Sequence, residues 1–132
     1  METTTELTNE QIDALEGAEL DRAVAEAFGW RFQKKFGWFN DTEPEIENRW
    51  KAGVRFSPSF DIDDAMSIVW GEMVKRGFCA DMQELFEPAS PRVAVRVVFW
   101  KKRDEWNAVG VYSLDKCTAI CLAAIKALRG KE

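Results

Sequence analysis

The segment RVAVRVVFW, residues 92–100, carries the strongest strand signal in the chain. Valine and aromatic side chains fill it, and these residue types favour extended backbone. Residues 78–86 precede it and alternate apolar with polar positions, as a strand with one buried face does. Residues 105–112 return after a hairpin connection at 101–104, and the prolines of 88–91 force a turn between the first two strands. The sequence therefore predicts a three-stranded antiparallel β-meander over residues 78–86, 92–100 and 105–112.

Helical segments flank this meander on both sides in the sequence. Residues 8–11 have the form of a capping box, which begins a short helical turn. Apolar residues follow the three-four spacing of one buried helix face over 18–28, 62–76 and 114–128. A glycine follows each of these three segments and ends it. We expect an α+β fold of order α-α-β-β-β-α, in which the meander is packed with α-helices on its faces.

The 132 residues are predicted to form a single domain spanning 1–132, because no repeat, linker or low-complexity segment divides them. Residues 1–6 are expected to be a flexible N-terminal tail. Residues 30–60 contain two glycines and two prolines, which break long elements, so we expect an irregular segment there. Eight of the sixteen aromatic residues lie in this segment. A connection this rich in aromatic residues is expected to pack or to bind rather than to be solvated.

The composition excludes several classes of enzyme. Histidine is absent, which removes Ser-His and Cys-His nucleophilic pairs, histidine general bases and most zinc or iron sites. The three cysteines have no framework spacing, and we expect Cys117 and Cys121, four apart on a predicted helix, to be small apolar core residues in a reducing compartment. Asp61, Asp63 and Asp64 could attract a divalent cation, but helix capping explains them better. We therefore expect no enzyme activity, no cofactor and no metal site, with carboxylate or lysine chemistry as the alternative.

The formal net charge of −5 at pH 7 is unevenly distributed. Residues 1–30 carry eight acidic side chains and one basic side chain, and the rest of the chain is slightly positive. Such an acidic segment would repel duplex DNA, so duplex DNA is not an expected partner. Polar residues rather than an apolar leader follow Met1, and no apolar run reaches the length of a membrane span. These features predict a cytoplasmic protein with no membrane partner.

Cationic and aromatic side chains interleave at the start of the aromatic segment. Together they suit a small anionic aromatic molecule such as a nucleotide, because a ring stacks on the base and a cation meets the phosphate. The predicted ligand-binding residues are Trp30, Arg31, Lys34, Lys35 and Trp38. A secondary cationic cluster at a hairpin tip comprises Lys101, Lys102 and Arg103. The alternative for both sets is ordinary packing, with rings in the core and charges facing water.

Three blocks of sequence carry a family resemblance. They are LEGAELDRAVAEAFGW at residues 15–30, FSPSFDIDDAMSIVWGEMVKRGF at 56–78 and VRVVFWKKRDEWNAVGVYSLDKCTAICLAAIKAL at 95–128. Together, and in this order, they resemble the phage ABA sandwich domain family. The resemblance implies a phage or prophage accessory protein that acts in the cytoplasm of a bacterial host, with helices sandwiching a small sheet. It carries over no catalytic residue.

Two classes of function follow from these features. In the first, the protein is a phage-encoded, non-enzymatic accessory or counter-defence protein that binds and sequesters a small anionic ligand, such as a nucleotide immune signal. In the alternative, it is a protein–protein interaction module that inhibits or adapts a host or phage protein through its acidic first helix. Six tryptophans are many for one small domain, so we expect exposed aromatic surface and predict a homo-oligomer.

Overall fold

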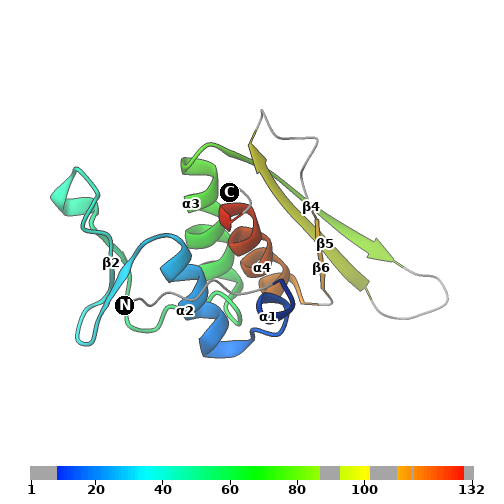
Figure 1. Cartoon of the computed structure of the whole chain (residues 1–132), viewed down its shortest axis with the longest axis horizontal. Coiled ribbons are helices and arrows are strands. Elements are labelled where there is room, and N and C mark those ends of the chain that lie inside the picture. The colour runs from blue at the N-terminus through cyan, green and yellow to red at the C-terminus, as the bar shows by residue number, and fades with distance from the viewer. Residues whose placement is uncertain (1–8, 87–92, 102–109, 114, 130–132) are drawn as a thin grey trace.

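The structure is a computed structural model of the chain, and it describes residues 9–86, 93–101, 110–113 and 115–129. Several predicted features lie outside these residues. They are the N-terminal tail at 1–6, the turn at 88–91, residues 105–109 of the third predicted strand, and the cluster members Lys102 and Arg103. In Figure 1 the helices form a layer in the middle of the molecule, with a small sheet on one side and longer strands on the other.

The predicted meander is confirmed as an antiparallel sheet of order β4-β5-β6. Its strands are β4 (Phe78–Phe86), β5 (Val93–Lys101) and β6 (Val111–Ser113). β4 and β5 pair in continuous register, from Phe78 opposite Lys101 to Phe86 opposite Val93. β6 pairs with β5 from Val95 opposite Ser113 to Val97 opposite Val111. The α+β class that the sequence predicts is therefore confirmed.

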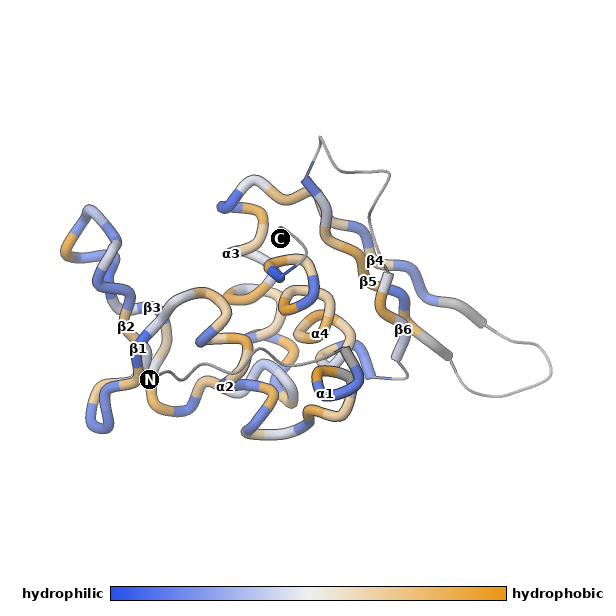
Figure 2. The backbone as a smooth tube through the Cα atoms, in the orientation of Figure 1, coloured by the Kyte–Doolittle hydropathy of each residue, from blue (hydrophilic) through white to orange (hydrophobic). Residues whose placement is uncertain are grey.

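One face of this sheet is buried by α4 (Lys116–Arg129). Val95, Val97 and Phe99 alternate along β5, and all three are buried in the core. Five of the eight buried side chains of α4 are alanine or cysteine, and the predicted core positions of Cys117 and Cys121 are confirmed. Figure 2 shows apolar residues concentrated on α4 and on the strands beside it, and hydrophilic residues in the connections of the small sheet.

The remaining helices pack around α4. α1 (Asn9–Asp13) and α2 (Gly17–Ala27) both contact it. The helix predicted over 62–76 is present as two consecutive elements: η2 (Asp64–Trp70) is a π-helix, and α3 (Gly71–Lys75) is an α-helix. The three-four apolar spacing predicts helix in both parts but does not reveal the change of helix type. π-helices are rare and occur frequently at functional sites.

Residues 30–60, where we expect an irregular segment, contain three strands of three residues each. These form a second antiparallel sheet of order β1-β2-β3, with β1 (Arg31–Gln33), β2 (Gly37–Phe39) and β3 (Trp50–Ala52). A short 3-10 helix, η1 (Ile46–Asn48), lies in the connection from β2 to β3. The glycines mark strand boundaries instead of an absence of strands. Gly37 begins β2 with a φ of 106°, and a side chain there would collide with the Ala52 carbonyl of β3.

Met73 and Val74 provide a matched test of the core. Met73 is fully buried in α3, whereas the neighbouring Val74 is half exposed. Met73→Ala should lower the free energy of unfolding by about 2–5 kcal/mol, because truncation leaves a cavity. Val74→Ala should change it by less than about 0.5 kcal/mol, as surface substitutions usually do. Urea unfolding followed by circular dichroism measures both changes, and equal effects would contradict the assigned helix face.

Candidate functional site

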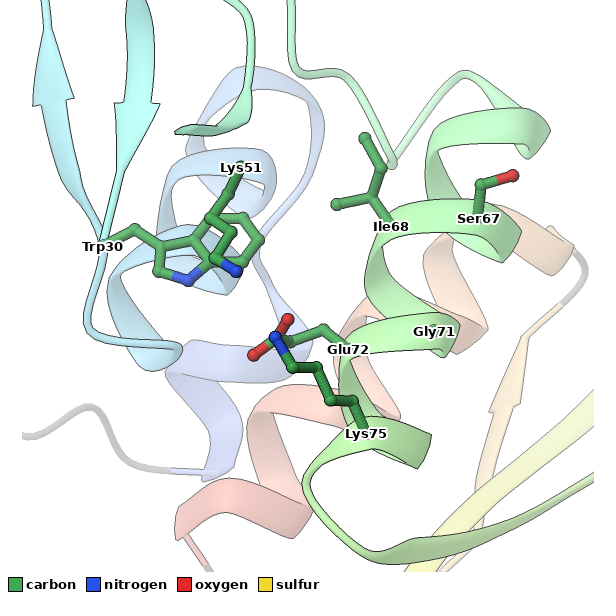
Figure 3. A pocket seen from close by; sticks show the side chains of 7 residues that line it. All are labelled: Trp30, Lys51, Ser67, Ile68, Gly71, Glu72 and Lys75. Atoms are coloured by element: carbon green, nitrogen blue, oxygen red, sulfur yellow. The ribbon is translucent and has the colours of Figure 1, made fainter. Parts of the chain in front are cut away.

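A cavity of about 320 Å³ lies between the small sheet and the helical layer. It is lined by Trp30, Lys51, Ser67, Ile68, Gly71, Glu72 and Lys75. In Figure 3 Trp30 and Lys51 reach toward it from one side, and Glu72 and Lys75 lie on the α3 side. Ser67 and Ile68 belong to the π-helix η2, and Gly71 begins α3. The cavity therefore brings together side chains from three separate parts of the chain.

Trp30 lines the cavity with a ring that is almost fully buried. Gly29, with a φ of 84°, ends α2, and the Trp30 N–H donates to the Ala25 carbonyl at 3.1 Å. The ring is 4% exposed and packs against Phe28 and Phe56, with ring centroids 4.8 and 5.8 Å away. Its indole Nε1 is buried and has no acceptor among the described residues. A buried donor without an acceptor costs about 1–3 kcal/mol.

Two lysines at the cavity share one carboxylate. Lys51 Nζ donates to Glu43 Oε2 at 2.6 Å, and Lys75 Nζ donates to the same oxygen at 3.2 Å. The Lys51 and Glu43 side chains are 11% and 13% exposed, whereas the Lys75 side chain is 56% exposed. The hydrogen bonds from Lys51 and Lys75 lower the pKa of Glu43, and the hydrogen bond to Glu43 raises the pKa of Lys75. Glu43 and Lys75 are therefore both charged near neutral pH.

The β2–β3 connection, residues 40–49, places Glu43 beside the lysines. The Asn40 side-chain oxygen accepts hydrogen bonds from the Thr42 N–H at 3.1 Å and the Thr42 hydroxyl at 2.7 Å. Arg49 Nε donates to the Glu43 carbonyl at 3.0 Å, and the Asn40 N–H donates to the Arg49 carbonyl at 2.7 Å. These contacts fix the backbone at Glu43, while its carboxylate is held by the lysines alone among the described residues.

Arg76 holds the second carboxylate of the cavity. Its Nε donates to Glu72 Oε2 at 2.8 Å, one helical turn away. Its Nη2 donates to the Phe28 carbonyl at 2.7 Å, and its guanidinium carbon lies 4.8 Å from the centroid of the Phe28 ring. Arg76 therefore joins the end of α3 to the end of α2, next to Trp30.

The charges around the cavity do not cancel. The ion pairs at this site join three cations, Lys51, Lys75 and Arg76, to two carboxylates, Glu43 and Glu72. One positive charge is left unbalanced within this group. A monoanion in the cavity would complete the charge pairing.

The structure brings one of the five predicted ligand-binding residues, Trp30, to this cavity. Arg31 lies on β1, pairs with Asp41 at 2.9 Å, and has its guanidinium carbon 5.5 Å from the centroid of the Phe39 ring. Lys34 and Lys35 are exposed in the turn between β1 and β2. None of these three cations is among the lining residues of the cavity.

Trp38 and Lys101 have contacts of other kinds. Trp38 is buried on β2 and packs against Phe32, with ring centroids 5.1 Å apart. Lys101 ends β5, where its Nζ donates to the Arg76 carbonyl and lies 4.5 Å from the centroid of the Phe78 ring. The burial of Trp38 and its contact with Phe32 agree with the alternative in which this ring is part of the core.

Sequence reasoning does not identify the charged residues that line the cavity. Lysine and glutamate are common on protein surfaces, and the partners of Glu43 lie 8 and 32 residues away from it. The one local signal is the spacing of Glu72 and Arg76, which is typical of any solvated helix face. Only the fold brings these charges into one site.

Aspartates outside the cavity bind backbone groups. The Asp21 side chain accepts from the Ser59 N–H at 2.7 Å, and burial raises the pKa of Asp21. Asp64 accepts from the Ser57 N–H at 2.9 Å, and Asp61 accepts from the backbone N–H two residues later. In the part of the chain that the structure describes, no group of three or more His, Cys, Asp or Glu is placed to hold a metal ion. None of the helices there has the length and apolar character needed to cross a membrane.

Alanine substitutions of Trp38 and Trp50 test whether each ring contributes to the packing of the small sheet. Trp38 is buried, whereas Trp50 on the adjacent strand is 47% exposed. Trp38→Ala should destabilise the protein by about 3–5 kcal/mol and lower its melting temperature by several degrees. Trp50→Ala should have a much smaller effect. Differential scanning calorimetry compares the two, and an unchanged melting temperature for Trp38→Ala would show that this ring is not structural.

The lowered pKa of Glu43 predicts that the free energy of unfolding depends on pH. Because its pKa is lowered in the folded chain, the unfolded chain takes up the proton at higher pH. The stability that Glu43 contributes is therefore fully present above its unfolded pKa and is lost as the pH falls through its lowered folded pKa. Urea unfolding at a series of acidic pH values should show a shallower loss of stability for Glu43→Gln than for the wild type. Parallel curves for the two proteins would contradict a role for this carboxylate.

Comparison with known proteins identifies no relative of this chain. No protein-family model, curated protein or solved structure matches it. The geometry and charge of the cavity are therefore the starting point for its function.

Proposed function

We propose that this chain is a non-enzymatic binding protein that holds a small anionic ligand in the cavity between Trp30, Lys51 and Lys75. The observation that carries this proposal is the excess of one positive charge among the paired side chains at the cavity, two of whose cations, Lys51 and Lys75, line it. Lysine ammonium groups bind phosphate and carboxylate as point charges. A single ligand of this class would balance the charge.

The size of the cavity supports a small ligand. Ligand pockets usually enclose about 300–1,000 Å³, and the volume here, about 320 Å³, lies at the lower end of that range. Little of the Trp30 ring is available for a base to stack on, because the residue is 4% exposed and packs against Phe28 and Phe56. For a nucleotide ligand, we therefore place the phosphate at the lysines and the base outside the Trp30 ring.

Sequestration without turnover agrees with the chemistry of the site. The hydrogen bonds from Lys51 and Lys75 lower the pKa of Glu43, which makes this carboxylate a weaker base. With no histidine in the chain, no general base of the usual kind is present. The family resemblance implies a phage or prophage accessory protein in the bacterial cytoplasm, and we propose that it counters host defence by holding a phosphate-bearing signal of its host.

A second candidate function is protein interaction through the outer aromatic cluster, defined as Phe36, Phe39 and Trp50. Phe36 and Trp50 are 66% and 47% exposed, and their ring centroids lie 5.7 Å apart. Phe39 contacts Trp50 at 4.7 Å. Exposed aromatic groups are typical of interfaces, including those of homo-oligomers. This cluster is a better candidate for the partner surface than the acidic α2, where Arg22 and Glu26 pair with each other at 3.1 Å.

Lys75→Gln and Lys34→Gln distinguish the cavity from the turn between β1 and β2. Both lysines are exposed, but only Lys75 lines the cavity. Isothermal titration calorimetry with inorganic phosphate and with adenosine monophosphate at low salt measures the affinity of each variant. We expect Lys75→Gln to weaken binding about tenfold, since a hydrogen bond to a charged group contributes about 1.5–3 kcal/mol and tenfold is about 1.4 kcal/mol.

The Lys34→Gln variant is the control and should bind like the wild type. A loss of affinity in Lys34→Gln alone would show that the anion binds at the turn between β1 and β2 and not in the cavity. Absence of heat with both ligands in the wild type would contradict the anion-binding proposal and favour the outer aromatic cluster as the functional surface.

A further inference from the structure

The small sheet leaves one aromatic face exposed. Within the outer aromatic cluster, the Trp50 ring centroid lies 5.7 Å from that of Phe36 and 4.7 Å from that of Phe39. Trp38, which precedes Phe39 on β2, is buried, and successive residues of a strand point to opposite faces of the sheet. Phe36 is 66% exposed and Trp50 is 47% exposed, so this face offers aromatic surface that a partner can cover.

The two ends of this face carry opposite charges. The first residue of β2 follows the turn at 34–36, and its last residue begins the β2–β3 connection. The two loops therefore leave the small sheet at opposite ends, and Figure 1 shows them projecting in opposite directions. The turn exposes two cations and the connection exposes two carboxylates: Lys34 and Lys35, and Glu45 and Glu47.

The other charged side chains of the small sheet already have contacts within the chain. Arg31 and Asp41 form an ion pair at 2.9 Å, and Glu43 binds the two lysines of the cavity. Arg49 is half-buried and donates to a backbone carbonyl. None of the four exposed charges at the two ends forms an ion pair with another residue in the described ranges. Each end can therefore meet a charge of opposite sign on a partner.

Each end also exposes one large apolar side chain beside its charges. Phe36 adjoins the two lysines of the turn, and Ile46, which is 74% exposed, lies between the two glutamates of the connection. The surface is thus apolar along its length and changes the sign of its charge from one end to the other. Such a surface is complementary to itself when a second copy is turned through a two-fold axis.

We propose that the outer aromatic cluster is the interface of a homodimer, in which the turn at 34–36 of each copy lies against the β2–β3 connection of the other. The two-fold axis makes the two end contacts identical. This inference rests on the second candidate function and deepens it by naming the partner, which is a second copy of this chain. It does not depend on anion binding, because no residue of this interface lines the cavity.

The charge pattern selects both the partner and its orientation. A uniformly anionic partner, such as a single-stranded nucleic acid, would be attracted to the lysine end and repelled from the glutamate end, and like charges in contact are costly. A second copy in the parallel orientation would also place like charges together. Only the antiparallel orientation of two copies brings unlike charges together at both ends.

Two charge-reversal variants of the full chain test this arrangement. The turn variant carries Lys34→Glu with Lys35→Glu, and the connection variant carries Glu45→Lys with Glu47→Lys. Analytical ultracentrifugation should show a dimer for the wild type and a dimer affinity at least about tenfold lower for each variant, because like charges then meet at both ends. An equimolar mixture of the two variants should recover the dimer, since every turn again meets a connection of opposite charge.

Two further variants serve as controls. Glu16→Lys with Glu19→Lys makes the same charge change at exposed positions of α2, and should leave the dimer affinity unchanged. Trp50→Ala changes no charge, and should lower the dimer affinity at least about tenfold, because a tryptophan at the centre of an interface contributes much of its affinity. Circular dichroism shows whether each variant is folded.

The outcomes separate this inference from both candidate functions. A wild type that is monomeric at high micromolar concentration would overturn the homodimer and leave the outer aromatic cluster to a partner of another kind. A dimer that the turn and connection variants or Trp50→Ala do not weaken, or that the α2 variant weakens equally, would overturn this interface. Weakening in both reversal variants without recovery in their mixture would overturn the antiparallel orientation. Failure of phosphate to bind would contradict the cavity site alone.

The wild-type dimer provides a second measurement if a reversal variant does not fold. Salt screens exposed charges, and the screening length falls from about 10 Å at 0.1 M to about 3 Å at 1 M. The dimer affinity of the wild type should therefore fall over this range of salt concentration. An affinity that does not change with salt would overturn the role of the charged ends.

Discussion

The close packing of α4 is the constraint on which the rest of the structure depends. This helix contacts β5, β6, α1, α2 and η2, so it is shared by almost every part of the core. Ala119, Ile120, Cys121 and Ala124 are fully buried on it. A helix that is apolar on most of its circumference is stable only when other elements enclose it. Because its central side chains are small, larger residues there would push the sheet and α2 apart.

This packing also sets the position of the cavity. With α2 and the η2–α3 helix both held against α4, the C-terminal ends of α2 and α3 lie near each other. The Phe28 carbonyl is one of the acceptors that a helix end leaves without an intrahelical donor, and Arg76 supplies the donor. A cation at this end of a helix is also favoured by the helix dipole. Trp30 follows directly, so a contact that satisfies two helix ends also fixes the buried indole at the cavity wall.

The sequence predicts the parts of this protein that depend on local periodicity. Strands β4 and β5 lie within one residue of their predicted ends, because alternation over nine positions leaves little freedom. The small sheet was not predicted, since three-residue strands are too short to show a period, and Gly37 suggests a break when considered alone. Of the site, only Trp30 was predicted. Glu43, Lys51 and Lys75 are ordinary surface residue types, and nothing in the sequence states that one carboxylate would meet both lysines.

The ion cluster at the cavity illustrates a conflict between stability and binding. A lysine as buried as Lys51 would stabilise a ligand most strongly if nothing else paired with it, but an unpaired buried cation would destabilise the folded chain. Pairing it with Glu43 removes that cost and lowers the affinity that remains for a ligand. The partial exposure of Lys75 works in the opposite direction, because it leaves this cation accessible to a ligand.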